Sequence, residues 1–304
     1  SDGHWIDTQI ATPMSKYPEY RMTRKSFGLD VLGTLVVEVE ASDGTIGFAV
    51  TTAGDIGAFI VEKHLARFLE GQHVTDLEKI WDQMYNATLF YGRKGVVLNT
   101  ISGIDLALWD LFGKQAGKPI ASILAPDVDL TTSLPTYATV WDDEEAHASI
   151  ENGAIAVKLH VERFGAPPDV DGIVALVSRT RKALGTEKAI MMDAFGAWDI
   201  PSTLQVARGV EQFEVDWIEE PVQPDNAAAY RQLMDQSPVP IAGGEHEYLS
   251  EGFQYLVDNK LHSVLQPDIN WCGGLTTLVQ IYRMAELAGL RVCPHRGSEP
   301  YALQ

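Results

Sequence analysis

The sequence has little of three things that would each point to a particular class of protein. Only two cysteines occur among 304 residues, Cys272 and Cys293, so a disulfide framework is not expected and a reducing compartment is favoured. Basic residues number 23 against 42 acidic ones, and the net charge of −19 opposes binding to nucleic-acid phosphates. No run of 18 apolar residues and no signal-peptide pattern occur, so neither a membrane span nor secretion is expected. These absences predict a cytoplasmic protein whose acidity serves solubility rather than an acidic-partner function.

Five short apolar runs in the second half of the chain each end in an acid or a histidine. The polar residues that end them are Asp193, Glu219, Glu245, Asp268 and His295. They follow one another at intervals of 26, 26, 23 and 27 residues, close to the length of one strand, one loop and one helix. In a (β/α)8 barrel the carboxyl ends of the strands form a ring around one mouth. Because each of these residues stands at the end of its strand, they are predicted to form one site at the mouth of such a barrel.

Two more strands, over 134–141 and 154–160, precede the five runs, and the stretches between the strands have helical periodicity. The predicted helices cover 171–184, 202–213, 226–235, 249–258 and 274–288. Seven strands that alternate with helices are typical of a parallel barrel, so we assign residues 126–304 to a TIM-type barrel domain. Because an open barrel would leave strand edges exposed, we expect an eighth strand in a C-terminal segment after Gln304.

Residues 1–125 are predicted to form a separate α+β domain. The β-branched runs over 31–40 and 45–51, joined by Asp43-Gly44, predict a hairpin. Helical periodicity follows over 56–70, 75–90 and 96–113. Gly117-Lys-Pro119 ends the last of these helices. This domain has no evident chemistry of its own.

The first 27 residues are polar and irregular, and Pro13 and Pro18 prevent a long helix there. Arg21, Arg24 and Lys25 form a basic cluster in this acidic chain. Two interpretations stay open for the cluster: a solvated loop, or a loop that closes over an anionic substrate.

Three carboxylates, Asp193, Glu219 and Glu245, end three consecutive predicted strands. Like charges that converge repel one another, so at least one acid would be neutralised unless a cation lay among them. A few carboxylate ligands, with positions left for water or substrate oxygens, suit Mg²⁺. The pattern therefore predicts a magnesium site, with solvated loop acids as the alternative. Glu220 and Glu247 lie close to two of the predicted ligands and compete with them for the assignment.

Asp268 and His295 end the next two predicted strands. A carboxylate beside an imidazole fixes the tautomer of the ring and raises its basicity. No serine or cysteine occurs in a nucleophile-elbow context, which disfavours nucleophilic hydrolysis. A metal that faces a histidine base suits removal of a proton next to a carboxylate, with the metal stabilising the enediolate.

The chain resembles the mandelate-racemase-like branch of the enolase superfamily over nearly its whole length. The matching segments are 4–7, 11–17, 31–41, 60–68, 91–95, 99–110, 217–220, 244–247 and 266–276. The N-terminal segments are most similar to those of L-rhamnonate dehydratases. The resemblance implies an α/β fold, a modified TIM barrel of (β/α)7β type with an N-terminal α+β capping domain. It also implies Mg²⁺-dependent dehydration of an acid sugar, L-rhamnonate or a close aldonate, to a 2-keto-3-deoxy acid through an enediolate.

Residue by residue, the resemblance implies that Asp193, Glu219 and Glu245 bind Mg²⁺. It implies that His295 is the acid/base and that Asp268 orients it. The candidates for substrate contact are Arg24, which matches an arginine of the capping loop, and Lys158, His160 and Glu299. The expected partners are a small acid sugar and further copies of the chain in a homo-oligomer, not nucleic acid or a membrane.

Two departures from the family pattern leave the substrate open. Racemising relatives carry Lys-x-Lys where this chain has Lys158-Leu159-His160, and the family's Pro-His-Gly-Ser-Ser is here Pro294-His-Arg-Gly-Ser-Glu299. His160 shares a strand face with Lys158, so it either enters the mouth or lies in a polar core. The alternatives are another acid-sugar dehydratase, an epimerase with His160 as second base, a noncatalytic acid-sugar-binding barrel, and a Schiff-base aldolase on Lys158.

Overall fold

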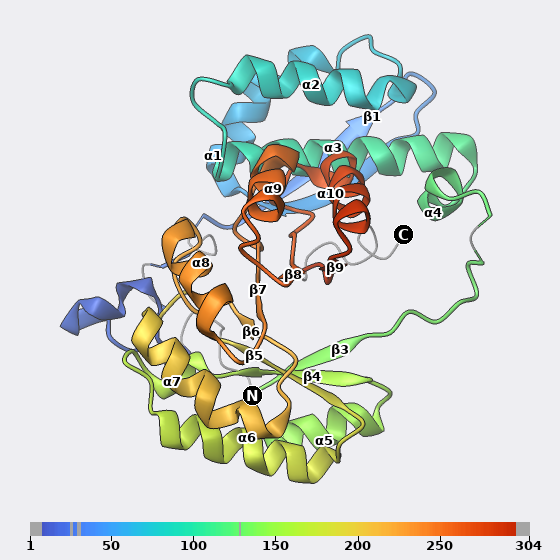
Figure 1. Cartoon of the computed structure of the whole chain (residues 1–304). Helices are drawn as coiled ribbons and strands as arrows, with labels where there is room; N and C mark the ends of the chain where they lie inside the picture. Colours follow the sequence, from blue (N-terminus) through green and yellow to red (C-terminus); the bar gives the residue numbers. More distant parts are fainter. Residues whose placement is uncertain (1–7, 25–26, 29–31, 128, 296–304) are drawn as a thin grey trace. The chain divides into compact units, whose positions relative to one another are not determined.

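The computed structural model of the chain describes residues 8–24, 27–28, 32–127 and 129–295 (Figure 1). The chain forms two compact units, each built from several segments. Unit 1 comprises Ser1–Gly28, Leu134–Gly243 and Leu256–Val264, and unit 2 comprises Leu29–Ser133, Gly244–Tyr255 and Leu265–Gln304. The division into domains at residues 1–125 and 126–304 stays a prediction.

Unit 1 is built on a sheet of short parallel strands. In chain order they are β3 (Tyr137–Val140), β4 (Ala156–His160), β5 (Ala189–Asp193), β6 (Ile218–Glu219) and β7 (Ile241–Gly243). Each strand pairs in parallel with the next one along the chain. Buried apolar residues align across the sheet, for example Met192 opposite Ile218. This register brings the carboxyl ends together, so that His160 lies opposite Asp193 and Asp193 lies opposite Glu219.

Four helices connect these strands and pack side by side in chain order (Figure 1). They are α5 (Asp143–Glu151), α6 (Val170–Leu184), α7 (Ile200–Val210) and α8 (Ala227–Gln236). α6, which corresponds to the helix predicted over 171–184, buries Ile173, Leu176, Val177 and Thr180, whose spacing places them on one helical face. α5 is not among the predicted helices. The structure shows why: this acidic helix buries only Ala146 and therefore has no apolar stripe.

Unit 2 contains the predicted hairpin and the helices that pack on it. Its strands β1 (Thr34–Glu40) and β2 (Ile46–Thr52) pair antiparallel. In the turn, Gly44 has a φ of 81°, and Oδ1 of Asp43 accepts a hydrogen bond from the Thr45 N–H at 2.9 Å. The helices are α1 (Gly54–Ile60), α2 (Leu77–Thr88), α3 (Val96–Ala116), α4 (Ile120–Leu124) and α10 (Gly274–Ala288).

α3 is the central helix of unit 2 and contacts both hairpin strands, α2 and α10. It is long and apolar enough to cross a membrane, but 78% of its most apolar stretch is buried inside the fold, as in a core helix. Gly117 ends it in the left-handed conformation with a φ of 62°, where the sequence predicts the stop. On its buried face, Asp105 accepts hydrogen bonds from Oγ1 of Thr276 at 2.6 Å and from the Thr276 N–H at 3.0 Å. These bonds join α3 to α10.

The remaining strands continue the parallel sheet. α9 (Leu249–Asp258) and β8 (Val264–Leu265) each begin in one unit and end in the other, and β9 (Arg291–Val292) lies in unit 2. The sheet order is β3-β4-β5-β6-β7-β8-β9, which is the order along the chain. The predicted α/β fold, a barrel-type series of seven strands with a separate antiparallel hairpin, is therefore confirmed.

Short 3-10 and π turns complete the described part of the chain. They are η2 (Pro13–Lys16), η3 (Pro18–Tyr20), η5 (Val61–Leu65), η6 (Ala66–Phe68), η7 (Val74–Asp76), η8 (Glu162–Phe164) and η9 (Glu211–Phe213). The two N-terminal turns each begin at a proline, which agrees with the expectation that Pro13 and Pro18 prevent a long helix. The helical segment predicted over 56–70 begins as α-helix and changes to a π turn after Ile60.

Candidate active site

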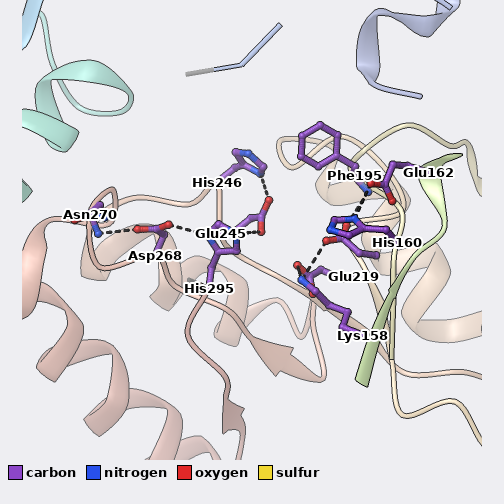
Figure 2. Close-up of polar contacts among 11 residues, drawn as sticks. Lys158, His160, Glu162, Phe195, Glu219, Glu245, His246, Asp268, Asn270 and His295 are labelled. Carbon is purple, nitrogen blue, oxygen red and sulfur yellow. Dashed lines mark hydrogen bonds and ion pairs between the residues drawn. The ribbon is translucent and has the colours of Figure 1, made fainter. Parts of the chain in front are cut away.

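Three charged side chains from neighbouring strands meet at the carboxyl end of the unit 1 sheet. Nζ of Lys158 on β4 lies 2.6 Å from Oε1 of Glu219 on β6 and 3.1 Å from Oδ2 of Asp193 on β5. Figure 2 shows Lys158 aimed at Glu219. All three side chains are buried. Because charges attract more strongly away from water, the ammonium holds both carboxylates in place.

Asp193 is held from two sides. Its Oδ1 accepts a hydrogen bond from the Phe195 N–H at 3.0 Å, while Lys158 faces Oδ2. Burial by itself raises the pKa of Asp193, but the charges of Lys158 and His160 and the hydrogen bonds from Lys158 and the Phe195 N–H together outweigh burial and leave the pKa below its ordinary value. Asp193 is therefore an anionic carboxylate at neutral pH.

These carboxylates suit a hard divalent cation. They are oxygen donors in a buried place, and the Lys158 ammonium already stands in for a cation between Asp193 and Glu219. In unit 2, Glu245 adds a third buried carboxylate two residues after β7. The residues present thus fit magnesium ligands, and their assignment to one ion stays a proposal.

A second group of site residues lies in unit 2. Nδ1 of His295 lies 2.7 Å from Oδ2 of Asp268, and its Nε2 lies 3.2 Å from Oε2 of Glu245 (Figure 2). Oδ1 of Asp268 accepts a hydrogen bond from the Asn270 N–H at 2.7 Å. Burial raises the pKa of Asp268, and the hydrogen bond with His295 opposes that rise. With Asp268 holding Nδ1, the imidazole can exchange a proton at Nε2.

Trp271 lies between two histidines of unit 2. The centroid of its ring system is 5.5 Å from that of His246 and 5.5 Å from that of His295. Nδ1 of His246 also lies 3.4 Å from Oε1 of Glu245. The indole therefore limits how far either imidazole can tilt beside Glu245.

The acids that compete with the predicted ligands have other surroundings. The Glu247 carboxylate pairs with Nζ of Lys94 at 3.0 Å, and its Oε1 accepts a hydrogen bond from the Tyr248 N–H at 2.8 Å. In unit 1, Glu220 is buried directly after β6 and has a φ of 35°. Of the two acids after β7, Glu245 and not Glu247 contacts His295, which favours Glu245 as the magnesium ligand.

A second histidine–carboxylate pair lies in unit 1, at the end of β4. Nδ1 of His160 is 2.6 Å from Oε1 of Glu162, and the Trp141 ring stacks on the imidazole at 4.5 Å between centroids. Burial raises the pKa of Glu162. Burial lowers the pKa of His160, but the charge of Glu162, its hydrogen bond and the charge of Asp193 together outweigh burial, so the pKa of His160 is raised. This pair therefore favours an imidazolium next to a carboxylate.

Arg24 is buried in unit 1 against the loop that follows β5. Its Cζ lies 5.1 Å from the centre of the Phe195 ring, a cation–π contact. Phe195 has a φ of 54°, in a region that favours glycine and costs a side-chain-bearing residue about 1–3 kcal/mol. Arg24, the predicted substrate-binding arginine, thus lies beside the loop that directly follows Asp193. Glu299, the last predicted contact, lies outside the described residues.

Two family models match the chain. The model of the mandelate racemase / muconate lactonizing enzyme N-terminal domain matches residues 8–125, and the enolase C-terminal domain-like model matches residues 141–304. The chain belongs to the enolase superfamily, in its mandelate racemase / muconate lactonizing enzyme branch. The resemblance in the sequence is thereby confirmed.

Several members of this branch that are similar to the chain are sugar-acid dehydratases. An L-rhamnonate dehydratase of Saccharopolyspora erythraea is 46% identical over 307 residues, 99% of this chain and 77% of that protein. The crystal structure of rhamnonate dehydratase from Gibberella zeae complexed with Mg has a TM-score of 0.89 at 34% identity, covering 99% of this chain and 74% of that one. L-Talarate dehydratase from Polaromonas sp. JS666, complexed with Mg and L-glucarate, has a TM-score of 0.77 at 32% identity, covering 88% and 75%.

Four residues around the site of this enolase-superfamily chain are not predicted from its sequence. They are Glu162, Phe195, His246 and Trp271. Each lies one to three positions after a predicted site residue, so its place in the sequence is the only signal that could have indicated it. The ring contacts of Phe195, His246 and Trp271 involve side chains far away in the sequence, whereas the ion pairs of Glu162 and His246 are with near neighbours.

Proposed function

We propose that this chain is a Mg²⁺-dependent dehydratase (hydro-lyase) of an acid sugar, L-rhamnonate or a closely related aldonate. The observation that carries the proposal is the pair of His295 and Asp268, in which Nε2 of the imidazole lies 3.2 Å from Glu245. A base beside a predicted metal ligand suits removal of the proton next to a substrate carboxylate. The 46% identity to an L-rhamnonate dehydratase supports this substrate.

Asp193, Glu219 and Glu245 would hold the magnesium ion. When bound, the ion would supply positive charge next to the substrate carboxylate, which favours loss of the neighbouring C2 proton. Lys158, which pairs with Asp193 and Glu219, would add a second positive charge to the same region. This is the role we assign to Lys158 as a substrate contact.

His295 carries out both proton transfers of the proposed reaction. The neutral imidazole takes the C2 proton at Nε2 while Asp268 accepts the hydrogen bond from Nδ1. The imidazolium then returns the proton to the C3 hydroxyl group, which leaves as water. The enol that remains tautomerises to the 2-keto-3-deoxy acid. Because one residue serves both steps, the elimination is syn.

The distal hydroxyl groups of the acid sugar bind to Arg24 in this proposal. The cation–π contact with Phe195, 5.1 Å from Cζ to the ring centre, fixes the guanidinium of this buried arginine. A planar guanidinium that is held in place loses little freedom when it donates hydrogen bonds to a polyol.

The structure bears differently on three of the alternatives. An epimerase that uses His160 as a second base is favoured by one observation, the 2.6 Å contact between His160 and Glu162. A Schiff-base aldolase on Lys158 is disfavoured, because two carboxylates favour the ammonium over the free amine that a nucleophile needs. A noncatalytic barrel is disfavoured by the paired His295 and Asp268.

We further propose a soluble enzyme of the cytoplasm that assembles as a homo-oligomer and takes a small molecule as its partner. The net charge of −19 agrees with an absence of nucleic-acid partners.

The test is turnover of a panel of aldonates by the purified protein with Mg²⁺, measured as formation of 2-keto acid. L-Rhamnonate is expected among the best substrates, and removal of Mg²⁺ by a chelator is expected to stop the reaction reversibly. Asp193→Asn is expected to lower Mg²⁺ affinity and turnover together, whereas the control Asp171→Asn, an exposed acid on α6, changes neither. The proposal is overturned if the Mg²⁺-loaded protein forms no 2-keto acid from any aldonate.

A further inference from the structure

We propose that Phe27 and Phe195 form an aromatic wall that selects a methyl group over a hydroxymethyl group at the distal end of the acid sugar. The inference rests on the proposed function, in which Asp193 lies at the carboxylate end of the substrate and Arg24 at the distal end. It adds a specificity determinant that the motifs of the sequence do not indicate.

Phe195 connects the two ends of the proposed substrate site within unit 1. Its backbone N–H donates to Oδ1 of Asp193 at 3.0 Å, and its ring centre lies 5.1 Å from Cζ of Arg24. A substrate that reaches from the Asp193 carboxylate to the Arg24 guanidinium therefore passes along this ring. The ring is half-buried, so part of it remains accessible to a ligand.

Phe27 completes the aromatic wall from the segment that carries Arg24. Its ring meets that of Phe195 edge to face, with centroids 5.8 Å apart and an angle of 72° between planes. The Phe27 N–H donates to the carbonyl oxygen of Arg24 at 2.9 Å and closes a turn. Arg24 and Phe27 thus supply a cation for hydroxyl groups and an apolar edge from the same short stretch of chain.

The conformation of Phe195 indicates that its ring is needed where it lies. A φ of 54° is unfavourable for phenylalanine, and the next residue, Gly196, also has a positive φ of 66°. Glycine or asparagine would adopt this conformation more readily. Strained residues of this kind cluster at ligand sites, where the surrounding structure holds them.

The chemistry of the wall determines what it prefers. An aromatic ring supplies neither a good hydrogen-bond donor nor a good acceptor, so a hydroxyl group pressed against it loses water without a replacement. A methyl group at the same place gains by burial. L-Rhamnonate ends in a methyl group, and L-mannonate is the same molecule with a hydroxyl group added at that carbon. Apolar pockets discriminate such pairs by roughly 10- to 100-fold.

The experiment compares kcat/KM for L-rhamnonate and L-mannonate in the Mg²⁺-loaded protein and in variants at the wall. The unaltered chain is expected to favour L-rhamnonate by roughly 10- to 100-fold. Phe195→Asn tolerates the left-handed backbone and offers a hydrogen-bond partner, so the preference is expected to fall at least tenfold. Phe195→Leu stays apolar and is expected to keep most of the preference for L-rhamnonate. Phe213→Asn, at a half-buried phenylalanine between α7 and β6, is the control that leaves it unchanged.

Calorimetric binding of both aldonates gives the same ratio for any variant that is folded but inactive. The inference is overturned if the unaltered chain does not distinguish the two aldonates, or if Phe195→Asn keeps the full preference in turnover or in binding. Either result leaves the proposed function standing, because dehydration itself would still be measured. Absence of turnover of all aldonates by the unaltered chain would instead remove the proposed function and this inference with it.

Discussion

Two histidines, His160 in unit 1 and His295 in unit 2, each lie beside a carboxylate, at 2.6 and 2.7 Å. They differ in what occupies the rest of the ring. Trp141 stacks on the face of His160 with 4.5 Å between the ring centroids, whereas Trp271 lies tilted against His295 at 5.5 Å. The second nitrogen of His295 faces another site acid, Glu245, at 3.2 Å.

The difference separates a histidine that is held from a histidine that is positioned to react. A carboxylate contact alone raises the basicity of an imidazole, and both rings have such a contact. Catalysis also needs the second nitrogen to reach the reacting atoms. In our proposal His295 meets this requirement and His160 contributes a fixed positive charge. The following predictions test that distinction.

The largest effect is expected for His295→Asn. Loss of the only proposed base should lower dehydration by at least about 10³-fold, near the upper part of the range for general acid–base catalysis. Exchange of the C2 proton with solvent deuterium should stop as well, as followed by NMR. Mg²⁺ binding, measured by calorimetry, should remain and serve as the control. Exchange that continues at the original rate would exclude His295 as the base.

Asp268→Asn is expected to be less severe but still large, about 10²-fold in kcat. The amide keeps the imidazole in place but offers a weaker acceptor and allows the wrong tautomer. Glu162→Gln makes the same change beside His160, and we expect it to lower kcat by less than about tenfold. Equal losses in the two variants would contradict the distinction between the pairs.

His160→Asn is expected to leave kcat for dehydration within about tenfold of the original value. In our proposal His160 supplies positive charge and transfers no proton, so its loss should mainly raise KM. Steady-state kinetics on the best aldonate measure the split between KM and kcat. If C2 exchange survives in His295→Asn and vanishes in His160→Asn, the base lies on β4 and an epimerase becomes the better proposal.

A smaller effect, on stability alone, is expected at Asp105, a buried carboxyl group that is paired with a threonine instead of a histidine. Asp105 is hydrogen-bonded by the hydroxyl and amide groups of Thr276, and burial raises its pKa to about 7. The folded chain keeps this proton where the unfolded chain has lost it, so the contribution is full near pH 4 and falls as pH rises towards 7. Asp105→Asn should therefore destabilise more at pH 5 than at pH 8, by roughly 1–3 kcal/mol. Urea unfolding of both proteins at pH 5 and pH 8 measures this. A loss of unfolding free energy that is the same at both pH values would contradict the prediction.

The strand ends were predictable because they recur at the length of one βα unit. A residue that returns with every βα unit must occupy the same place in each, so Asp193 and Glu219 could be placed before any contact was known. The boundaries agree to within a few residues even where a strand is as short as β6 or β9. The hairpin of β1 and β2 was predictable for another local reason: Asp43-Gly44 adopts the positive φ of a tight turn at low cost, and Gly44 has a φ of 81°.

Contacts between side chains were not predictable to the same degree. Glu162 follows the end of β4 in a 3-10 turn, and no spacing rule indicates that its carboxylate returns to His160. The ring of Phe195 has its place because of a left-handed backbone angle that the sequence does not favour. The Phe195 ring packs against Arg24 and Phe27 from a distant segment, and the Glu162 contact depends on how the turn after β4 folds; a periodic pattern contains neither.

Lys158 has a consequence for the biosynthesis of the chain. Two buried carboxylates, Asp193 and Glu219, receive their counter-charge from a residue of the same sheet, so unit 1 carries its own counter-ion. A newly made chain can therefore bury both acids without waiting for an ion from the medium. In our proposal, a Mg²⁺ ion that arrives later would meet carboxylates whose charge Lys158 already offsets in part. Folding of unit 1 would then not depend on the metal supply.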